Sequence, residues 1–172
     1  MKILETERLV LRQLSADDAE LILELLNEPA FLRNIGDKGV RTIDDARRYI
    51  LDGPVANYER LGFGLYKVEL KGEGENVPIG TCGLVKRDGL EDVDIGFAFL
   101  SRFWGKGYAF ESASAVMTYG KETLGIERIV AVVAPHNEAS INVLRKLGLE
   151  LKGSVKLPGY ENEDSLLFTP AV

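Results

Sequence analysis

The segment that most constrains the fold is an apolar run at residues 94–100, followed by two closely spaced glycines and a helical pattern. The run predicts a buried strand, and small and apolar residues at 109–124 recur at the spacing of one helix face. Gly105 and Gly107 permit a tight turn and leave room for a ligand. Because the free N–H groups of the helix face this turn, the segment predicts an anion site for a phosphate or pyrophosphate. An ordinary strand-to-helix connection would need the same glycines.

The residues around these glycines exclude two other phosphate-binding loops. A dinucleotide-binding GxGxxG turn requires a small third residue, and Phe110 occupies that position. A P-loop requires a lysine and then serine or threonine after its second glycine, whereas Tyr108 follows Gly107. The anion site is therefore expected to belong to a different class.

The composition is ordinary for a soluble globular protein, with 45% hydrophobic and 28% charged residues. The 172 residues fit a single domain, 1–172, with a sizeable core. A formal net charge of −6 without a basic run argues against nucleic-acid binding, and no stretch approaches the roughly 18 apolar residues of a membrane span. The single Cys82 and the lack of a signal-like stretch after Met1 predict a cytoplasmic protein. With one cysteine and one histidine, His136, no metal site is expected.

Periodicity and turn residues predict the order β-α-α-β-β-β-α-β-α-β-β, in a mixed sheet with helices on both faces. The expected strands are 7–14, 62–70, 78–86, 94–100, 128–134, 149–156 and 160–168. The expected helices are 15–27, 42–58, 109–125 and 137–148, and residues 30–41 are expected to be loop.

Capping residues support the helix starts. Ser15 and Thr42 each precede an acid three residues on, which is typical of a capping box. Asn137 is expected to cap the last helix. The pair at 53–54, Gly-Pro, is expected to break or kink the second helix.

This order and the glycine turn resemble the GNAT superfamily of acyl-CoA-dependent N-acetyltransferases, and more narrowly its Rim-type subgroup. Three blocks carry the resemblance: 6–12 (TERLVLR), 94–111, and 137–149. The best-known members of that subgroup acetylate the N-termini of ribosomal proteins. The resemblance implies the GNAT fold, an α/β (α+β) domain with a mixed, mostly antiparallel sheet of about seven strands.

The resemblance implies that acetyl-CoA is the cosubstrate and that its pyrophosphate binds backbone N–H groups of a turn written Q/R-x-x-G-x-G/A. The matching residues are Trp104, Gly105, Lys106, Gly107, Tyr108 and Ala109. Tryptophan at the first position is usual for the Rim-type subgroup. Lys106 is either a cation near the phosphates or a solvated lysine.

The resemblance also implies a slot for the pantetheine arm, where the strand at 94–100 splays at a bulge from the strand at 128–134. The backbone of Phe97 and Phe99 would hold the arm, and an amide near Phe97 or Ala98 would donate to the thioester oxygen. Asn137 and Ser140 match the family's N-x-x-S, which lines the other side of the slot.

Asp94 matches the position where the Rim-type pattern usually has glutamate, and it is the candidate base, directly or through water. A solvent-facing acid at a strand start is the alternative. Many superfamily members carry a tyrosine where this chain has Leu144. Either Ser140 or water therefore protonates the leaving thiolate, or the thiolate leaves unaided, with Tyr108 and Tyr160 as more distant candidates.

The leading acceptor is a peptide or protein N-terminal amine. A small amine (a polyamine, an amino acid or an antibiotic) is the alternative, and a non-catalytic acyl-CoA sensor is the rival from another class. Selectivity is expected in the loop at 31–39 and the turn at 157–164, where Glu161, Glu163 and Asp164 could attract an amine. The family habit also suggests a homodimer, and His136 is expected to be a turn residue.

Overall fold

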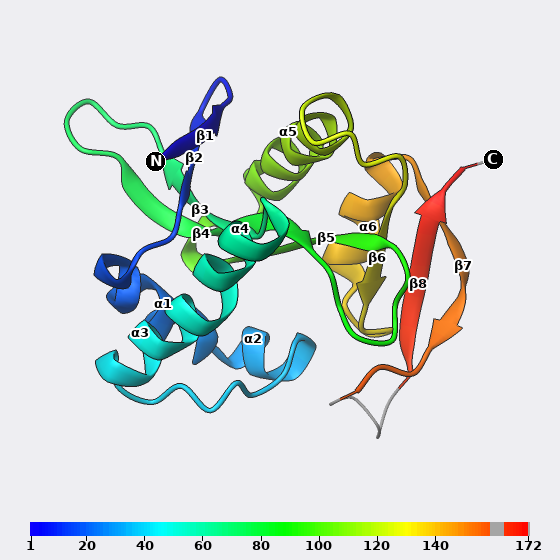
Figure 1. Ribbon diagram of the computed structural model, residues 1–172, viewed down its shortest axis with the longest axis horizontal. Coiled ribbons are helices and arrows are strands. Elements are labelled where there is room, and N and C mark those ends of the chain that lie inside the picture. The colour runs from blue at the N-terminus through cyan, green and yellow to red at the C-terminus, as the bar shows by residue number, and fades with distance from the viewer. Residues whose placement is uncertain (159–163, 172) are drawn as a thin grey trace.

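The computed structural model describes residues 1–158 and 164–171, which form an eight-stranded sheet in the order β1-β2-β3-β4-β5-β6-β8-β7 (Figure 1). The strands are β1 (Lys2–Glu5), β2 (Leu9–Gln13), β3 (Leu65–Leu70), β4 (Val77–Val85), β5 (Val93–Phe99), β6 (Ile129–Val133), β7 (Leu149–Val155) and β8 (Ser165–Pro170). Each of these neighbours pairs antiparallel except β5 and β6, which are parallel. The expected mixed, mostly antiparallel sheet is confirmed.

Helices cover both faces of this sheet, as expected (Figure 1). The α-helices are α1 (Ala19–Leu26), α2 (Pro29–Asn34), α3 (Ile43–Ile50), α4 (Ala56–Leu61), α5 (Tyr108–Glu122) and α6 (Glu138–Lys146). Shorter helical turns are η1 (Ala16–Asp18), η2 (Leu51–Val55) and η3 (Ser101–Phe103). The helices α1 to α4 lie on one side of the central strands, and α5 lies on the other.

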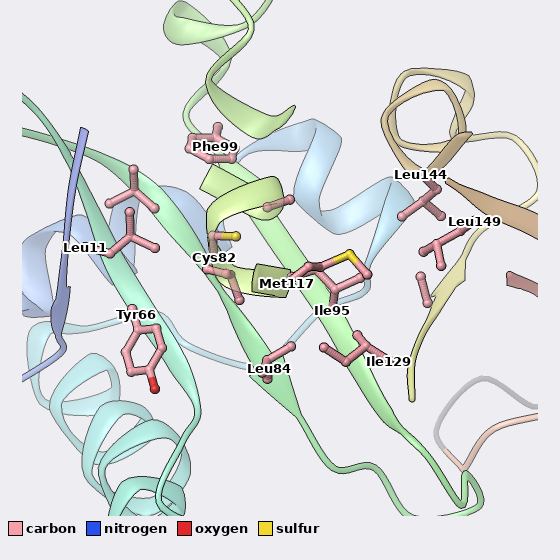
Figure 2. Packing of buried hydrophobic residues seen from close by; sticks show 14 of the residues in the cluster. Leu11, Tyr66, Cys82, Leu84, Ile95, Phe99, Met117, Ile129, Leu144 and Leu149 are labelled. Carbon is pink, nitrogen blue, oxygen red and sulfur yellow. The ribbon is translucent and has the colours of Figure 1, made fainter. Parts of the chain in front are cut away.

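The core is divided into two clusters by the sheet. The larger joins the strands to α5 and α6 and includes Ile95, Val116 and Ile129, and Figure 2 shows part of it. The smaller joins α1 to α3 and includes Ile22 and Ile50. Together the two clusters pack helices against both faces of the sheet, and this packing holds the central strand β5 in place.

The expected capping boxes are present at both helix starts. Ser15 accepts a bond from the amide of Asp17, and Asp18 accepts from the amide of Ser15, although the first turn, η1, is a 3₁₀ turn. Thr42 and Asp45 form the second box at the start of α3. The Gly-Pro pair lies in η2, a π-type turn that connects α3 to α4 without leaving the helical path. The expected irregularity is therefore a widened turn.

Two elements differ from the sequence prediction. Residues Lys2–Glu5 form β1, which pairs with β2, so the sheet has eight strands where about seven were predicted. This strand is short and half-buried, and its sequence pattern is correspondingly weak. The segment 30–41, predicted to be loop, contains most of α2, with Pro29 at its first position. Proline fits there because the first helical N–H needs no partner.

Candidate active site

The site begins where two parallel strands separate. β5 and β6 pair only through Val93 with Ile129 and Asp94 with Val130. From Ala131 onward β6 pairs with β8 instead. β5 stays in unbroken register with β4 as far as Phe99. The expected splay is therefore present, but the bulge expected in β5 is not, because the separation comes from β6 leaving the pair.

The register of β5 determines which main-chain groups face the opening. The amide of Leu100 donates to the carbonyl of Ile79 on β4, at 2.9 Å. Because bonding direction alternates along a strand, the main-chain groups of Phe97 and Phe99 point away from β4. They therefore face the gap that β6 has left. The same alternation turns the amide of Ala98 toward β4. Of the two amides that the sequence proposed as donors to the thioester oxygen, only that of Phe97 therefore faces the gap.

Two cavities meet at this gap. The inner cavity, of about 510 Å³, extends toward α1, α3 and η2. The turn cavity, of about 590 Å³, extends toward the start of α5. Residues that line both are Phe31, Asn34, Ile35, Phe97, Ala98, Asn137 and Ser140. A molecule in one cavity can thus touch a molecule in the other beside the open edge of β5.

The predicted pyrophosphate turn forms one end of the turn cavity. The turn residues that line it are Trp104, Gly105, Gly107, Tyr108 and Ala109. Gly105 and Gly107 have φ of 75° and 84°, in the region that favours glycine, and Gly107 is the N-cap of α5. The helix therefore directs its first N–H groups into the turn.

Two of the turn's side chains are placed differently from one another. The indole of Trp104 lines the cavity and donates to the carbonyl of Phe99 at 2.8 Å. Lys106 is exposed and is not among the residues that line the cavity. A phosphate contact by the Lys106 ammonium group remains a prediction.

Asn137 and Ser140 lie opposite β5, at the start of α6. The side-chain oxygen of Asn137 accepts a bond from the amide of Ser140 at 3.3 Å, so the predicted cap is present. Both residues line both cavities. Leu144, one turn further along α6, is 2% exposed and belongs to the core, so its position offers no proton donor. His136 lies before the cap, with its Nε2 3.3 Å from the carbonyl of Arg33, consistent with the expected turn role.

Asp94 is buried rather than solvent-facing, at 1% exposure. Its two carboxylate oxygens lie 3.0 and 3.1 Å from Nε of Arg87. Burial raises the pKa of Asp94 to about 6, against the opposing effect of Arg87. Arg87 lines the inner cavity, whereas Asp94 lines neither cavity. The predicted base is therefore separated from the cavity, and proton transfer to it would require a bridging water.

The segment 31–39, where the sequence predicted selectivity, begins in α2, although residues 30–41 were expected to be loop. α2 provides Phe31 and Asn34, which line both cavities. Glu28, just before α2, accepts a bond from the amide of Ser101 at 2.8 Å and so ties the helix to the segment after β5. Pro29 at the first helical position was the signal that could have revealed α2. Arg87 was missed too, and its sequence context in a polar turn carries no distinguishing signal.

Other predicted features fall partly outside the described residues. The turn at 157–164 was expected to affect selectivity, but residues 159–163, with Tyr160, Glu161 and Glu163, lie outside that range. Within 1–158 and 164–171, no group of three or more acidic, histidine or cysteine side chains is placed to hold a metal ion. Across the same residues, no helix has the length and apolar character needed to cross a membrane.

Comparison with known proteins identifies the class to which this fold and site belong. Residues 8–150 match the family described as the acetyltransferase (GNAT) domain. The uncharacterized N-acetyltransferase YoaA of Bacillus subtilis is 32% identical over 161 residues, which cover 93% of this chain and 89% of YoaA. A GNAT-family acetyltransferase structure from Bacillus anthracis superposes with a TM-score of 0.79 at 29% identity, covering 98% of this chain and 97% of the other.

The chain therefore belongs to the GNAT acetyltransferase family. It is an acetyl-CoA-dependent N-acetyltransferase, as the sequence predicted. One relative whose name states its substrate is the alanine N-acetyltransferase of ribosomal protein uS5 from Escherichia coli, which is 32% identical over 94 residues. That match covers 55% of this chain and 47% of the enzyme. The open edge at Phe97 and the glycine turn at the start of α5 fit the amide-rich arm and the pyrophosphate of acetyl-CoA.

Proposed function

We propose that this enzyme acetylates the N-terminal α-amine of a peptide or protein by direct attack on acetyl-CoA. The observation that carries the proposal is the meeting of two cavities beside the open main-chain edge of Phe97. The turn cavity ends at the pyrophosphate turn and suits the donor. The inner cavity lies on the side of α1 to α4 and suits the acceptor.

In this arrangement the pantetheine arm lies along the free edge of β5, and the N–H groups at the start of α5 bind the pyrophosphate. The amide of Phe97 donates to the thioester oxygen, where negative charge develops during attack. The amine nitrogen enters from the inner cavity and forms the C–N bond. The tetrahedral intermediate then collapses, the C–S bond breaks, and the electron pair leaves with the sulfur.

Two protons must move in this reaction. The attacking amine loses one, and we propose that a water passes it to the buried carboxylate of Asp94, whose raised pKa makes it a better acceptor than an ordinary aspartate. The leaving thiolate gains the other through the hydroxyl of Ser140, which lines both cavities and passes on a proton taken from solvent water, so that no serine alkoxide is left. Because a thiol has a pKa near 8.5, departure without an acid is also chemically accessible.

The charges of the inner cavity favour an α-amine over a polycation. Among the described residues, its ionisable lining groups include Lys38 and Arg87 but only one carboxylate, Asp52. Since Arg87 is paired with Asp94, this described lining has no excess of carboxylates to attract a polyamine. An N-terminal amine, with a pKa of about 8, is partly neutral at pH 7, whereas a lysine amine, with a pKa of about 10.4, needs stronger help from a base. The similarity to the uS5-alanine enzyme supports the same choice.

The test has two stages. Calorimetric titration of CoA measures donor binding first. Release of free thiol from acetyl-CoA is then followed with an alanine-initiated peptide, the same peptide blocked at its N-terminus and carrying an internal lysine, spermidine, and free amino acids. We expect CoA binding and the highest rate with the unblocked peptide. A higher rate with spermidine or an amino acid would identify the small-amine alternative, and binding without turnover on any amine would favour the acyl-CoA sensor.

A further inference from the structure

The sequence block TERLVLR at 6–12 is one of the three that carry the resemblance to the family. In the structure its first residues contact the pyrophosphate turn and the start of α5. Thr6 and Arg8 both lie in the β1–β2 connection, and both contact Glu111 in the first turn of α5. We propose that Arg8 is a positioning residue, which orients the turn's amides for the CoA pyrophosphate. This inference rests on the proposed donor site.

Glu111 is the anchor of this cluster. Its Oε2 accepts bonds from the hydroxyl of Thr6 at 2.5 Å and from the amide of Arg8 at 2.9 Å. Its Oε1 accepts from Nε of Arg8 at 2.6 Å. Although partial burial opposes ionisation, the bonds from Thr6 and Arg8 lower the pKa of Glu111. The Glu111 carboxylate is thus charged and accepts three hydrogen bonds. These bonds hold both the main chain and Nε of Arg8 in place.

From this anchor the guanidinium of Arg8 extends to the turn. Its Nη1 donates to the main-chain carbonyl of Lys106 at 3.0 Å. Its Cζ lies 4.6 Å from the centre of the Tyr108 ring, a cation–π contact. A side chain at Gly107 would crowd the same group, since a Cβ built there lies 3.3 Å from Nη2. Arg8 therefore contacts Lys106 and Tyr108, the residues on either side of Gly107.

The bond to Lys106 determines where the next amide points. A trans peptide group is planar, with its carbonyl and its N–H directed oppositely. With the carbonyl of Lys106 held toward Arg8, the N–H of Gly107 is directed away from Arg8. Gly107 lines the turn cavity, where the pyrophosphate is expected. Arg8 thereby selects the orientation of an anion-binding amide in a glycine turn that would otherwise sample several orientations.

Arg12 provides a matched control. It lies in β2, four residues after Arg8, and its Nε forms a 2.8 Å ion pair with Glu69. The exposure of the Arg12 and Glu69 side chains, 39% and 12%, is similar to that of Arg8 and Glu111, 42% and 18%. Arg12 lines neither cavity. Arg12→Met therefore removes a comparable ion pair without touching the turn.

Trp104 provides the readout, because it is the only tryptophan of the chain and lines the turn cavity. Its fluorescence is titrated with CoA and with pantetheine, which lacks the pyrophosphate, in the wild type, Arg8→Met, Arg8→Lys and Arg12→Met. We expect Arg8→Met to weaken CoA binding by roughly tenfold, because a charge-assisted contact that shapes the site is lost. Pantetheine affinity should stay within about twofold of the wild type, and Arg12→Met should change neither affinity.

The remaining outcomes decide the inference separately from the proposed function. Equal weakening of CoA and pantetheine by Arg8→Met would show a general loss of structure and overturn the positioning role. Unchanged CoA binding would overturn it as well. Full CoA affinity in Arg8→Lys would also overturn the positioning role, because lysine keeps the positive charge but lacks the planar, forked guanidinium group. Failure of the wild type to bind CoA would instead remove the donor site itself.

Discussion

The indole Nε1 of Trp104 donates a hydrogen bond to the main-chain carbonyl of Phe99, 2.8 Å away. Phe99 is the last residue of β5, and its carbonyl faces the gap that β6 has left. Trp104 thus satisfies a strand carbonyl that lacks a neighbouring strand. The same side chain lies half-exposed on the wall of the turn cavity. One residue therefore connects the end of the strand to the start of the pyrophosphate turn.

Trp104→Phe should lower the free energy of unfolding by about 1 kcal/mol, because one hydrogen bond is lost while the aromatic ring is kept. It should also weaken CoA binding several-fold, since the turn loses its tie to β5. Urea unfolding and calorimetry measure the two effects. Trp104→Gln, which restores a residue of the superfamily pattern and a side-chain donor, should recover more of the CoA affinity than phenylalanine does. Equal affinity in all three proteins would contradict a role for this bond.

Gly105→Ala should lose both stability and CoA affinity. Gly105 has φ of 75°, and a left-handed conformation costs a non-glycine residue about 1–2 kcal/mol. A Cβ there meets no protein atom within 4 Å, so the added methyl would extend into open space on the wall of the turn cavity. Urea unfolding measures the first loss, and calorimetry with CoA measures the second.

Gly125→Ala is the control for this prediction. Gly125 has φ of 71°, and a Cβ there also meets nothing within 4 Å. It follows α5 at the opposite end of the helix and lines neither cavity. It should lose the same stability as Gly105→Ala while keeping its CoA affinity. A similar loss of affinity in both variants would show that backbone strain, and not ligand contact, is responsible.

Local signals predicted much of this architecture. Ser15, Thr42 and Asn137 cap their helices as expected, because capping depends on a few neighbouring residues. The strand, glycine turn and helix at 94–124 were also predictable, since each has a strong pattern of its own. These elements carry most of the donor side of the site.

The parts that escaped prediction depend on particular partners, some near in sequence and some distant, that the pattern of each segment does not specify. β1 exists because β2 is beside it, and α2 lies against α1 and the segment after β5. The environment of Asp94 is set by Arg87, seven residues earlier across a turn. The position of Arg8 depends on Glu111, which is 103 residues away. Periodicity and spacing contain none of these pairings.

Asp94→Asn should change how stability depends on pH. Burial raises the pKa of Asp94 from 3.8 to about 6, so the folded chain holds a proton that the unfolded chain releases between these values. Stability contributed by this group is complete below about pH 4 and is lost as pH rises through about 6. Asp94→Asn should flatten this slope in urea unfolding measured across the window. Asp92→Asn, at an exposed ion pair with Arg128, should keep the wild-type slope.

The same variant tests the proposed base. If water carries the amine proton to Asp94, the rate of acetyl transfer should rise with pH through an apparent pKa near 6, and Asp94→Asn should lose this rise. Asp92→Asn should retain it. A rise that persists unchanged in Asp94→Asn would assign proton removal to another group, and the carboxylate would then serve to hold Arg87 on the cavity wall.

Ser140→Ala tests whether the leaving thiolate receives its proton from the protein. Ser140 lies where the two cavities meet, and Leu144 provides no acid one turn away. If the hydroxyl donates, kcat should fall roughly tenfold with little change in KM for acetyl-CoA, a modest loss because a thiolate is a tolerable leaving group. Ser114→Ala, on α5 and outside both cavities, should leave both constants unchanged. A higher KM with unchanged kcat would mean that Ser140 holds the pantetheine arm and that the thiolate leaves unaided.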